Sequence, residues 1–321
     1  MDELILPRIV LTGASGWIGR SILHQLQMYL SPKQFLERVI PLSSIKKSLK
    51  STGYFGQPYD FCTYPLFEIK KNLFNKKPFT LIHTAFLTKD KISEYGIDNF
   101  IALNKKITLH AMEICKKENV QNIILISSGS ARKYDNKSFL KNKKSYEVND
   151  SYAFLKRSEE ISFNSLNINC LILRVFALSG FFARSPNAFA MISFLSSAIK
   201  RERIHINSTR RCIRGYVSSS QLALAILNIL ADKKNYFPAM LNAVTDTTDL
   251  LSMASYISGI FNLEPPLHEI NNNLDPDIYT ANQLPFSKLL KSYNLKPMSL
   301  KNQIGETSNW LADLNNYKKL F

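Results

Sequence analysis

The 321-residue chain is longer than a usual single domain and has the composition of a folded protein. Hydrophobic residues make up 45% and charged residues 21%, which excludes an intrinsically disordered protein. Lys and Arg outnumber Asp and Glu by 41 to 25, giving a formal charge of +16. Such a surplus can mark contact with nucleic acid, membrane or phosphate groups, but the lysines are scattered without interleaved aromatic residues. We therefore interpret most of them as a solvated surface and expect no nucleic-acid partner.

Cysteine spacing and hydropathy indicate which cellular compartment and which kinds of bound metal to expect. The four cysteines stand far apart without a CxxC pair, so neither a zinc site nor a disulfide framework is predicted, and we expect no metal. No apolar run reaches the length that spans a bilayer, and the chain passes from Met1 into its first predicted strand without room for a cleavable signal. We expect a cytoplasmic protein without membrane insertion.

Short apolar runs rich in β-branched residues alternate with longer amphipathic stretches through the first half of the chain. This alternation is typical of βαβ units around a parallel sheet. Strands are predicted at 9–12, 38–42, 80–83, 122–127 and 169–175, with a weaker one at 60–66, where Pro65 interrupts the pattern. Helices are predicted between them at 16–30, 101–118 and 151–166.

After Gly180 the alternation loosens. A helix at 187–200, a short strand at 203–206 and a helix at 221–231 precede a segment that Pro and Asn break into short pieces. The sequence therefore predicts an α/β fold, with a Rossmann-type doubly wound parallel sheet and a smaller mixed C-terminal substrate lobe. We assign residues 1–180 to the NAD(P)-binding domain, to which later segments can return, and 181–321 mainly to the substrate-binding lobe.

A glycine-rich turn follows the first predicted strand, in the stretch IVLTGASGWIG at 9–19. Its GxxGxxG spacing permits a tight turn and lets the backbone approach a pyrophosphate at the N-terminus of a helix. Because the turn joins an apolar strand to an amphipathic helix, we predict that it binds a dinucleotide. The residues expected to contact the cofactor here are Gly13, Ser15, Gly16, Trp17, Ile18 and Gly19.

The end of the second predicted strand bears on the choice between NAD and NADP. An acidic residue there would hold the ribose hydroxyls of NAD, but the chain has Ser43 and Ser44, followed by Lys46 and Lys47. Small hydroxyls and cations suit the additional 2′-phosphate of NADP. We predict NADP, with contacts from Ser43 and Lys46, and keep NAD as the alternative, since lysines that simply face solvent would give the same pattern.

Three polar residues form a candidate proton-transfer site. Ser128 follows the strand at 122–127, while Tyr152 and Lys156 lie four residues apart on one face of the helix at 151–166. A phenol ordinarily titrates at about pH 10, so acid–base work near neutral pH needs a cation that favours the phenolate. Lys156 supplies that charge and can bond the nicotinamide ribose. We predict all three residues as catalytic, with Tyr152 and Lys156 also contacting the cofactor.

Together with the glycine turn, these residues resemble the extended short-chain dehydrogenase/reductase superfamily, in particular its NAD(P)-dependent nucleotide-sugar epimerase, dehydratase and ketoreductase group. Further stretches agree with the family in its own order: LIHTAF at 81–86, QNIILISSGSA at 121–131, LRVFALSG at 173–180 and RGYVSSSQLALAI at 214–226. The resemblance covers residues 8–250.

The resemblance implies further cofactor residues. Thr84, Ala85 and Phe86 would line the cofactor, and Asn104 would support an active-site water and belong to the same site. His83 would pack beside the cofactor without transferring protons.

It also implies residues that contact the substrate. Arg214 matches a position that binds the diphosphate, which a guanidinium holds through two parallel hydrogen bonds. Arg174, at a strand end, is interpreted as structural. The full set assigned to the substrate is Ser128, Ser130, Ala177, Asn187 and Arg214.

Departures from the family pattern narrow the chemistry. The family's sugar dehydratases follow the catalytic residue with an Asp-Glu pair, whereas Gly129 and Ser130 follow Ser128 here, so dehydration is not expected. Ala177 replaces an Asn that touches the substrate in relatives. The leading hypothesis is a keto-sugar reductase that transfers hydride from NADPH to a nucleotide-linked sugar. The alternatives are an NAD-dependent nucleotide-sugar 4-epimerase and, from another class, a non-catalytic dinucleotide-binding scaffold or redox sensor.

Relatives commonly dimerise by packing the helix that bears Tyr and Lys, together with its neighbour, into a four-helix bundle. The resemblance therefore implies a homodimer built from 101–118 and 151–166. The apolar residues Ile107, Ala111, Ile114 and Phe154 suit such a bundle, but they equally suit packing against the sheet.

Overall fold

The computed structural model describes residues 6–50, 60–69, 73–135, 151–183, 188–232 and 237–313. The chain divides into two units. The first unit comprises residues 1–174 and 223–241, and the second comprises 175–222 and 242–321.

A seven-stranded sheet forms the centre of the first unit. Its strand order is β5–β2–β1–β6–β7–β8–β12, and the pairs from β5 to β7 are all parallel. Every residue of β1, β2 and β6 is buried, as expected for parallel strands covered on both faces. The strands are β1 (Ile9–Thr12), β2 (Val39–Ser43), β5 (Tyr64–Pro65), β6 (Phe79–His83), β7 (Val120–Ser128), β8 (Asn169–Val175) and β12 (Met240–Ala243).

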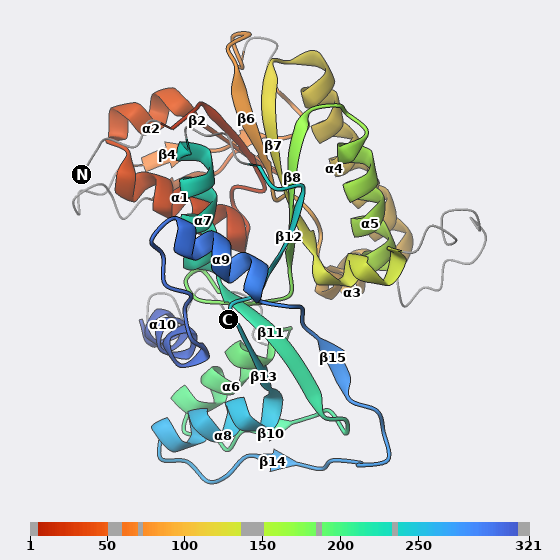
Figure 1. Ribbon diagram of the computed structural model, residues 1–321, viewed down its shortest axis with the longest axis vertical. Coiled ribbons are helices and arrows are strands. Elements are labelled where there is room, and N and C mark those ends of the chain that lie inside the picture. Colours follow the sequence, from red (N-terminus) through yellow and green to blue (C-terminus); the bar gives the residue numbers. More distant parts are fainter. Residues whose placement is uncertain are drawn as a thin grey trace. The chain divides into compact units, whose positions relative to one another are not determined.

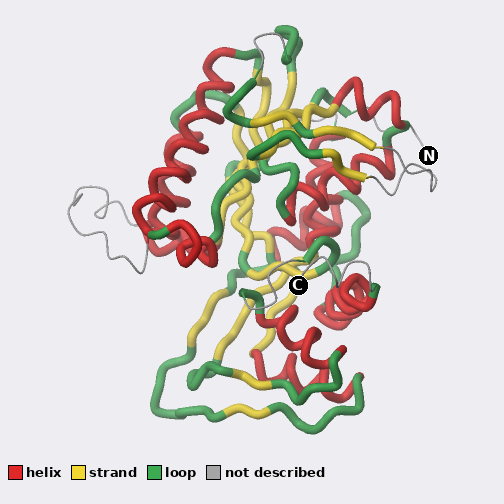
Figure 2. Tube along the Cα trace, turned by 180° about the vertical axis from the view of Figure 1, so that it is seen from behind, coloured by secondary structure: helices red, strands yellow, loops and turns green. Residues whose placement is uncertain are grey.

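Helices cover both faces of this sheet (Figures 1 and 2). On one face lie α1 (Trp17–Tyr29) and α7 (Ser219–Ala231), and on the other lie α4 (Ile97–Lys117) and α5 (Ser151–Asn164). The chain turns from β1 to β2 on one side and to β6 on the other, which makes β1 the switch point where such sheets bind ligands. The predicted Rossmann-type doubly wound fold is confirmed.

The hydrophobic core of the first unit decides one alternative that the sequence left open. α4 contributes Ala111 and Ile114 to the buried core beneath the sheet, and Ile107 packs against it. Phe163 of α5 is fully buried in the same cluster. These apolar positions of α4 therefore pack toward the sheet.

The five main strands and three helices predicted for this half are all present, with small differences at their ends. The weak strand at 60–66 proves to be two, β5 in the central sheet and β4 (Asp60–Cys62), which pairs with β3 (Ser48–Lys50). Helix α2 (Pro32–Arg38) was not predicted, although Ser31 and Gln34 form a capping box and Pro32 opens the helix. Short helical segments also missed are η1 (Lys89–Lys91), α3 (Ile92–Tyr95) and η2 (Gly129–Tyr134).

The second unit contains a smaller mixed sheet. β11 (Cys212–Ser218) pairs antiparallel with β13 (Asp246–Asp249) and parallel with both β9 (Ala177–Ser179) and β15 (Asp277–Tyr279). β10 (His205–Ile206) pairs with β14 (Leu267–His268). The helices of this unit are α6 (Ala190–Ile199), α8 (Leu250–Ile260), α9 (Leu284–Ser292) and α10 (Leu300–Ala312).

Three of those helices escaped the sequence prediction. α8 and α10 begin at the capping residues Asp249 and Ser299, whose side chains accept hydrogen bonds from the backbone N–H three residues on. α9 begins with Pro close to its first position. Within the described residues, none of the helices is both long and apolar enough to cross a membrane.

Candidate active site

The glycine turn after β1 has the close contacts that exclude larger residues. Gly13 has φ +70°, and a Cβ there would lie 2.7 Å from the backbone nitrogen of Ala85. A Cβ on Gly19 would collide with the carbonyl oxygen of Gly13. The turn is closed by a 2.8 Å hydrogen bond from the Gly16 N–H to that same carbonyl. The backbone is thus folded tightly against the loop that follows β6.

The N-terminus of α1 suits an anionic ligand. Its N-cap is Gly16, which has no side chain to accept the first N–H groups, and its first turn has no acidic residue. Ser15, Gly16 and Ile18 are half-buried, while Trp17 is buried. Backbone donors and the helix dipole together favour a phosphate group at such a terminus. The cradle therefore fits the pyrophosphate of a dinucleotide.

Thr12, at the end of β1, fastens the loop after β6 to this turn. Its hydroxyl lies 2.7 Å from Nδ1 of His83 and accepts a 3.3 Å hydrogen bond from the Ala85 N–H. The Thr84 hydroxyl donates to the Thr12 carbonyl at 2.7 Å. Thr84, Ala85 and Phe86 are half-buried at the carboxyl end of β6, beside the glycine turn. His83 is buried beneath them.

The residues predicted to choose between NAD and NADP lie at the end of β2. Ser43 is buried, its hydroxyl donates to the Ile45 carbonyl, and it lies 2.7 Å from the Thr63 hydroxyl oxygen. Lys46 is exposed. The side chain of Ser43 is therefore already engaged inside the protein, and Lys46 is the freely accessible polar group of the predicted pair.

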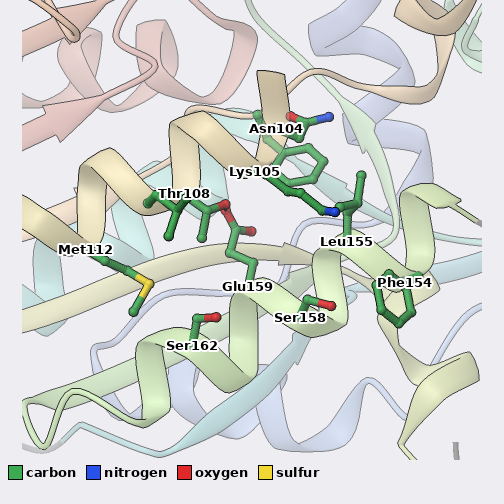
Figure 3. A pocket seen from close by; sticks show the side chains of 11 residues that line it. Asn104, Lys105, Thr108, Met112, Phe154, Leu155, Ser158, Glu159 and Ser162 are labelled. Carbon is green, nitrogen blue, oxygen red and sulfur yellow. The ribbon is translucent and has the colours of Figure 1, made fainter. Parts of the chain in front are cut away.

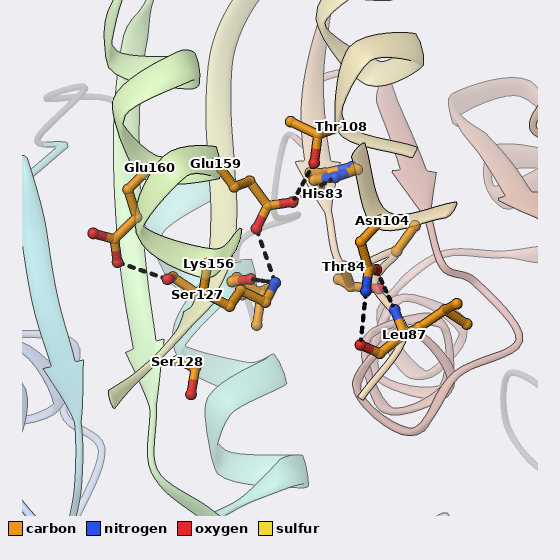
Figure 4. Close-up of polar contacts among 12 residues, drawn as sticks. His83, Thr84, Leu87, Asn104, Thr108, Ser127, Ser128, Lys156, Glu159 and Glu160 are labelled. Carbon is orange, nitrogen blue, oxygen red and sulfur yellow. Dashed lines mark hydrogen bonds and ion pairs between the residues drawn. The ribbon is translucent and has the colours of Figure 1, made fainter. Parts of the chain in front are cut away.

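Asn104 of α4 fixes the segment after Phe86. Its side-chain oxygen accepts a 2.8 Å hydrogen bond from the Leu87 N–H, and its amide nitrogen donates to the Leu87 carbonyl at 3.3 Å (Figure 4). Asn104 is fully buried. This pair of hydrogen bonds holds the loop at the level of the site, and the predicted contact of Asn104 with an active-site water remains a prediction.

The predicted catalytic residues come from β7 and α5. Ser128, the last residue of β7, is 5% exposed. Its hydroxyl oxygen accepts a 3.2 Å hydrogen bond from the backbone N–H of Ser130, which is half-buried. Tyr152 is the second residue of α5, and its ring meets that of Phe86 edge to face at 5.7 Å between centroids. The Nζ atom of Lys156 lies 3.7 Å from the centre of the same Phe86 ring. The phenol and the ammonium group therefore share one aromatic neighbour.

The ammonium group of Lys156 is buried and has two polar partners. It donates to the Ile126 carbonyl at 3.1 Å and to Oε2 of Glu159 at 2.9 Å (Figure 4). The Lys156 side chain is 6% exposed, so these contacts are shielded from solvent. Its predicted contact with the nicotinamide ribose remains a prediction.

Glu159 is the residue that the sequence reasoning missed. Its fully buried carboxylate contacts Lys156, lies 3.2 Å from Nε2 of His83, and accepts a 3.3 Å hydrogen bond from the Thr108 hydroxyl. Burial by itself would raise the pKa of Glu159, but the charge of Lys156 and the nearby His83 imidazole outweigh it and hold that pKa below its ordinary value. The available signal was an acidic residue one helical turn after Lys156, on the buried side of an amphipathic helix.

A cavity of about 220 Å³ opens between α4 and α5 near these groups (Figure 3). Glu159 extends from α5 toward Thr108 across it. Within the part of the chain that the structure describes, no group of three or more His, Cys, Asp or Glu residues is placed to hold a metal ion. The cavity is lined by Phe86, Asn104, Lys105, Thr108, Leu109, Met112, Phe154, Leu155, Ser158, Glu159 and Ser162.

The predicted substrate residues of the second unit have other surroundings. Arg214 of β11 donates to Oδ2 of Asp277 at 2.6 Å and to the Asp277 carbonyl at 2.7 Å. The guanidinium group of Arg214 is therefore already bonded to a residue of the same unit. Ala177 is half-buried in β9, opposite Tyr216. Asn187 lies outside the described residues.

Arg174, at the end of β8 in the first unit, has the structural role expected of it. It bonds Asp135 with both terminal nitrogens, at 2.8 and 2.6 Å, and also bonds both oxygens of Glu160. Its side chain is 3% exposed. These contacts join β8, α5 and the end of η2.

Comparison with known proteins agrees with this geometry. Residues 9–242 match the model of the NAD dependent epimerase/dehydratase family, and the chain belongs to that family. No curated protein is similar enough in sequence to count as a match.

Solved structures of similar fold come from several enzymes. One is UDP-N-acetylglucosamine 4-epimerase from Methanobrevibacter ruminantium in complex with UDP-N-acetylmuramic acid, with 18% identity, TM-score 0.70, and coverage of 95% of this chain and 98% of that one. Another is UDP-glucose 4-epimerase from Thermus thermophilus in complex with NAD, with 17% identity, TM-score 0.64, and coverage of 96% of this chain and 99% of that one. A third is RMD from Pseudomonas aeruginosa in complex with NADPH, with 16% identity, TM-score 0.67, and coverage of 94% of this chain and 98% of that one. At these identities the likeness shows the fold.

Proposed function

We propose that this protein is an NAD(P)-dependent oxidoreductase that reduces a keto group on a nucleotide-linked sugar. The observation that carries the proposal is the convergence of Tyr152 and Lys156 on Phe86, which follows the loop packed against the Gly13 turn. A buried cation that shares an aromatic neighbour with a phenol suits proton transfer to a carbonyl oxygen, because a nearby positive charge favours the phenolate. Family membership supports the same class of cofactor and substrate.

Each side chain has a definite task in this proposal. The bound nicotinamide would supply the hydride. Tyr152 donates a proton to the substrate oxygen, Ser128 hydrogen-bonds that oxygen, and Lys156 stabilises the phenolate and bonds the ribose. The turn at 13–19 holds the pyrophosphate, and 84–86 lines the nicotinamide end.

The substrate contacts proposed are Ser128, Ser130, Ala177, Asn187 and Arg214. For Arg214 to bind a diphosphate, its guanidinium must exchange Asp277 for the ligand. Asp277→Asn is therefore expected to strengthen diphosphate binding, and unchanged binding would count against this role of Arg214.

The end of β2 supports NADPH, because it has an exposed Lys46 and no carboxylate at Ser43 or Ser44. A second candidate is an NAD-dependent 4-epimerase, in which the same residues oxidise and then re-reduce the sugar. The inward hydroxyl of Ser43 favours this candidate, since it removes one group that would bind a 2′-phosphate. The similar 4-epimerase from Thermus thermophilus was solved with NAD.

Two measurements on the purified protein separate these candidates. Mass spectrometry of the bound cofactor distinguishes tightly held NAD from NADPH or an absent cofactor. Incubation with NADPH and a panel of nucleotide-linked 4-keto sugars is expected to consume cofactor. Interconversion of two nucleotide sugars without net consumption would show an epimerase instead. A biological function unaffected by Tyr152→Phe would support a non-catalytic scaffold.

We also propose a homodimer through the outer faces of α4 and α5. Leu109 of α4 is 61% exposed and lines the cavity between these helices, where Phe154 also lies. Light scattering is expected to give twice the chain mass, and Leu109→Glu to reduce it to one chain. An unchanged mass in that variant would place the interface elsewhere.

A further inference from the structure

Two of the three N–H donors of Lys156 are used inside the protein, and one of its partners is an anion. Glu159 lies 2.9 Å from Nζ, and its side chain has no exposed surface. At this distance and burial, the charges of the ammonium and carboxylate largely cancel for any group farther away. The Tyr152 phenol therefore experiences a weaker positive charge than Lys156 alone would provide.

The other groups around Glu159 can be stated for each element packed against it. β6 contributes His83, whose Nε2 lies 3.2 Å from Oε1. α4 contributes the uncharged Thr108, and its exposed Lys105 lines the same cavity. β7 contributes the Ile126 carbonyl, which bonds Lys156 directly. Lys156 is thus the permanent positive charge that Glu159 contacts within the site, and His83 places an imidazole beside it.

Its neighbour Glu160 provides an internal comparison. Glu160 is equally buried, but its oxygens bond Ser127, Arg157 and Arg174. Those contacts do not include Lys156. Two adjacent carboxylates on α5 therefore face different sets of cations.

We propose that Glu159 is a positioning residue that holds the Lys156 ammonium and sets the positive charge that Tyr152 experiences. This inference rests on the proposed function, in which Lys156 controls the ionisation of Tyr152. Removing the negative charge leaves the ammonium uncompensated. Glu159→Gln then favours the Tyr152 phenolate, so Tyr152 ionises at lower pH, by about one unit.

The ionisation of Tyr152 can be measured directly. Phenolate absorbance is followed against pH for each protein and for the same protein carrying Tyr152→Phe, and the difference isolates Tyr152 from the other tyrosines. The variants compared are Glu159→Gln, Glu159→Asp, Lys156→Met and Glu160→Gln. Circular dichroism at each pH confirms that the folded protein is being titrated.

The proposal predicts a definite order of Tyr152 midpoints. Glu159→Gln lowers the midpoint, Glu159→Asp lowers it less because its carboxylate is withdrawn by one methylene group, and Lys156→Met raises it. Glu160→Gln, the matched control with a carboxylate of equal burial, leaves it unchanged.

Two results would overturn the inference for different reasons. A midpoint that rises in Lys156→Met but does not fall in Glu159→Gln rejects the role of Glu159 and leaves the proposed function intact. If the Tyr152 midpoint is unchanged in Lys156→Met, the pairing of Tyr152 with Lys156 is rejected. The proposed function depends on that pairing, and the role of Glu159 is rejected with it. If Glu159→Gln does not fold, Glu159→Asp decides, and an unmoved midpoint in that variant overturns the inference.

Discussion

Glu159 and Glu160 are adjacent on α5, and the side chains of both are fully buried, yet they belong to different networks. Glu160 meets arginines, whose planar guanidinium groups stay protonated and hold carboxylates in a fixed geometry. Glu159 instead contacts the ammonium group of Lys156, and the imidazole of His83 lies 3.2 Å away. The two carboxylates are equally buried, so the difference lies in their partners: arginines join Glu160 to the fold, whereas Glu159 contacts Lys156, a proposed catalytic residue.

The largest effect is expected on the arginine side. Arg174→Ala leaves Glu160 with one fewer cation in a site without solvent, so the free energy of unfolding should fall by about 3–5 kcal/mol. Urea unfolding at neutral pH measures the change. A loss below about 1 kcal/mol would mean that the network adjusts to the missing guanidinium, and the contrast between the two carboxylates would be weaker than described.

Lys156→Met is expected to destabilise the protein by about 2 kcal/mol at neutral pH, since Glu159 keeps its contact with His83. Without the lysine, burial becomes the dominant influence and raises the pKa of Glu159. A carboxylate with a raised pKa contributes stability at low pH and loses it as pH rises through that pKa. Unfolding followed across pH should therefore show stability that decreases toward neutral pH, and a flat profile would count against the ion pair.

The acid limb of wild-type stability should depend on Glu159 in the opposite sense. Its pKa is held below the ordinary value, so its contribution is present above about pH 4.3 and is lost as pH falls through the lowered pKa. Glu159→Gln should flatten that limb in unfolding experiments. Part of the dependence should remain, because the hydrogen bond with Arg174 lowers the pKa of Asp135 as well. An identical acid limb in wild type and variant would contradict this assignment.

The smallest effect is expected at Thr108, whose hydroxyl donates one 3.3 Å hydrogen bond to Glu159. Thr108→Val should cost less than about 1 kcal/mol. Ser127→Ala removes the 2.6 Å hydrogen bond to Glu160 and should cost more, about 1–2 kcal/mol. Thermal unfolding measures the loss of stability in each variant. A larger loss for Thr108→Val than for Ser127→Ala would show that the shorter hydrogen bond does not contribute more to stability.

Much of the first unit was predictable from sequence because its signals are local. Buried parallel strands give continuous apolar runs, and the glycines at the end of β1 are required by contacts with their immediate surroundings. The pairing of Tyr152 with Lys156 follows from helix periodicity alone.

What escaped prediction depends on contacts between distant segments. Glu159 was missed because His83 and Thr108 come from other elements, 76 and 51 positions earlier in the chain by residue number. The inward turn of Ser43 depends on Thr63, which lies between β4 and β5. In the second unit, capped helices α8 and α10 were obscured by frequent Pro and Asn in the connecting segments.

We propose that Tyr152 transfers a proton while a nicotinamide cofactor exchanges hydride with a nucleotide-linked sugar. A single-turnover measurement of reduced-nicotinamide absorbance tests this proposal most directly. Wild type and Tyr152→Phe are compared with the same nucleotide sugar at saturating cofactor. We expect the variant to bind cofactor normally and to react at least about a hundredfold more slowly. Equal rates in the two proteins would contradict it.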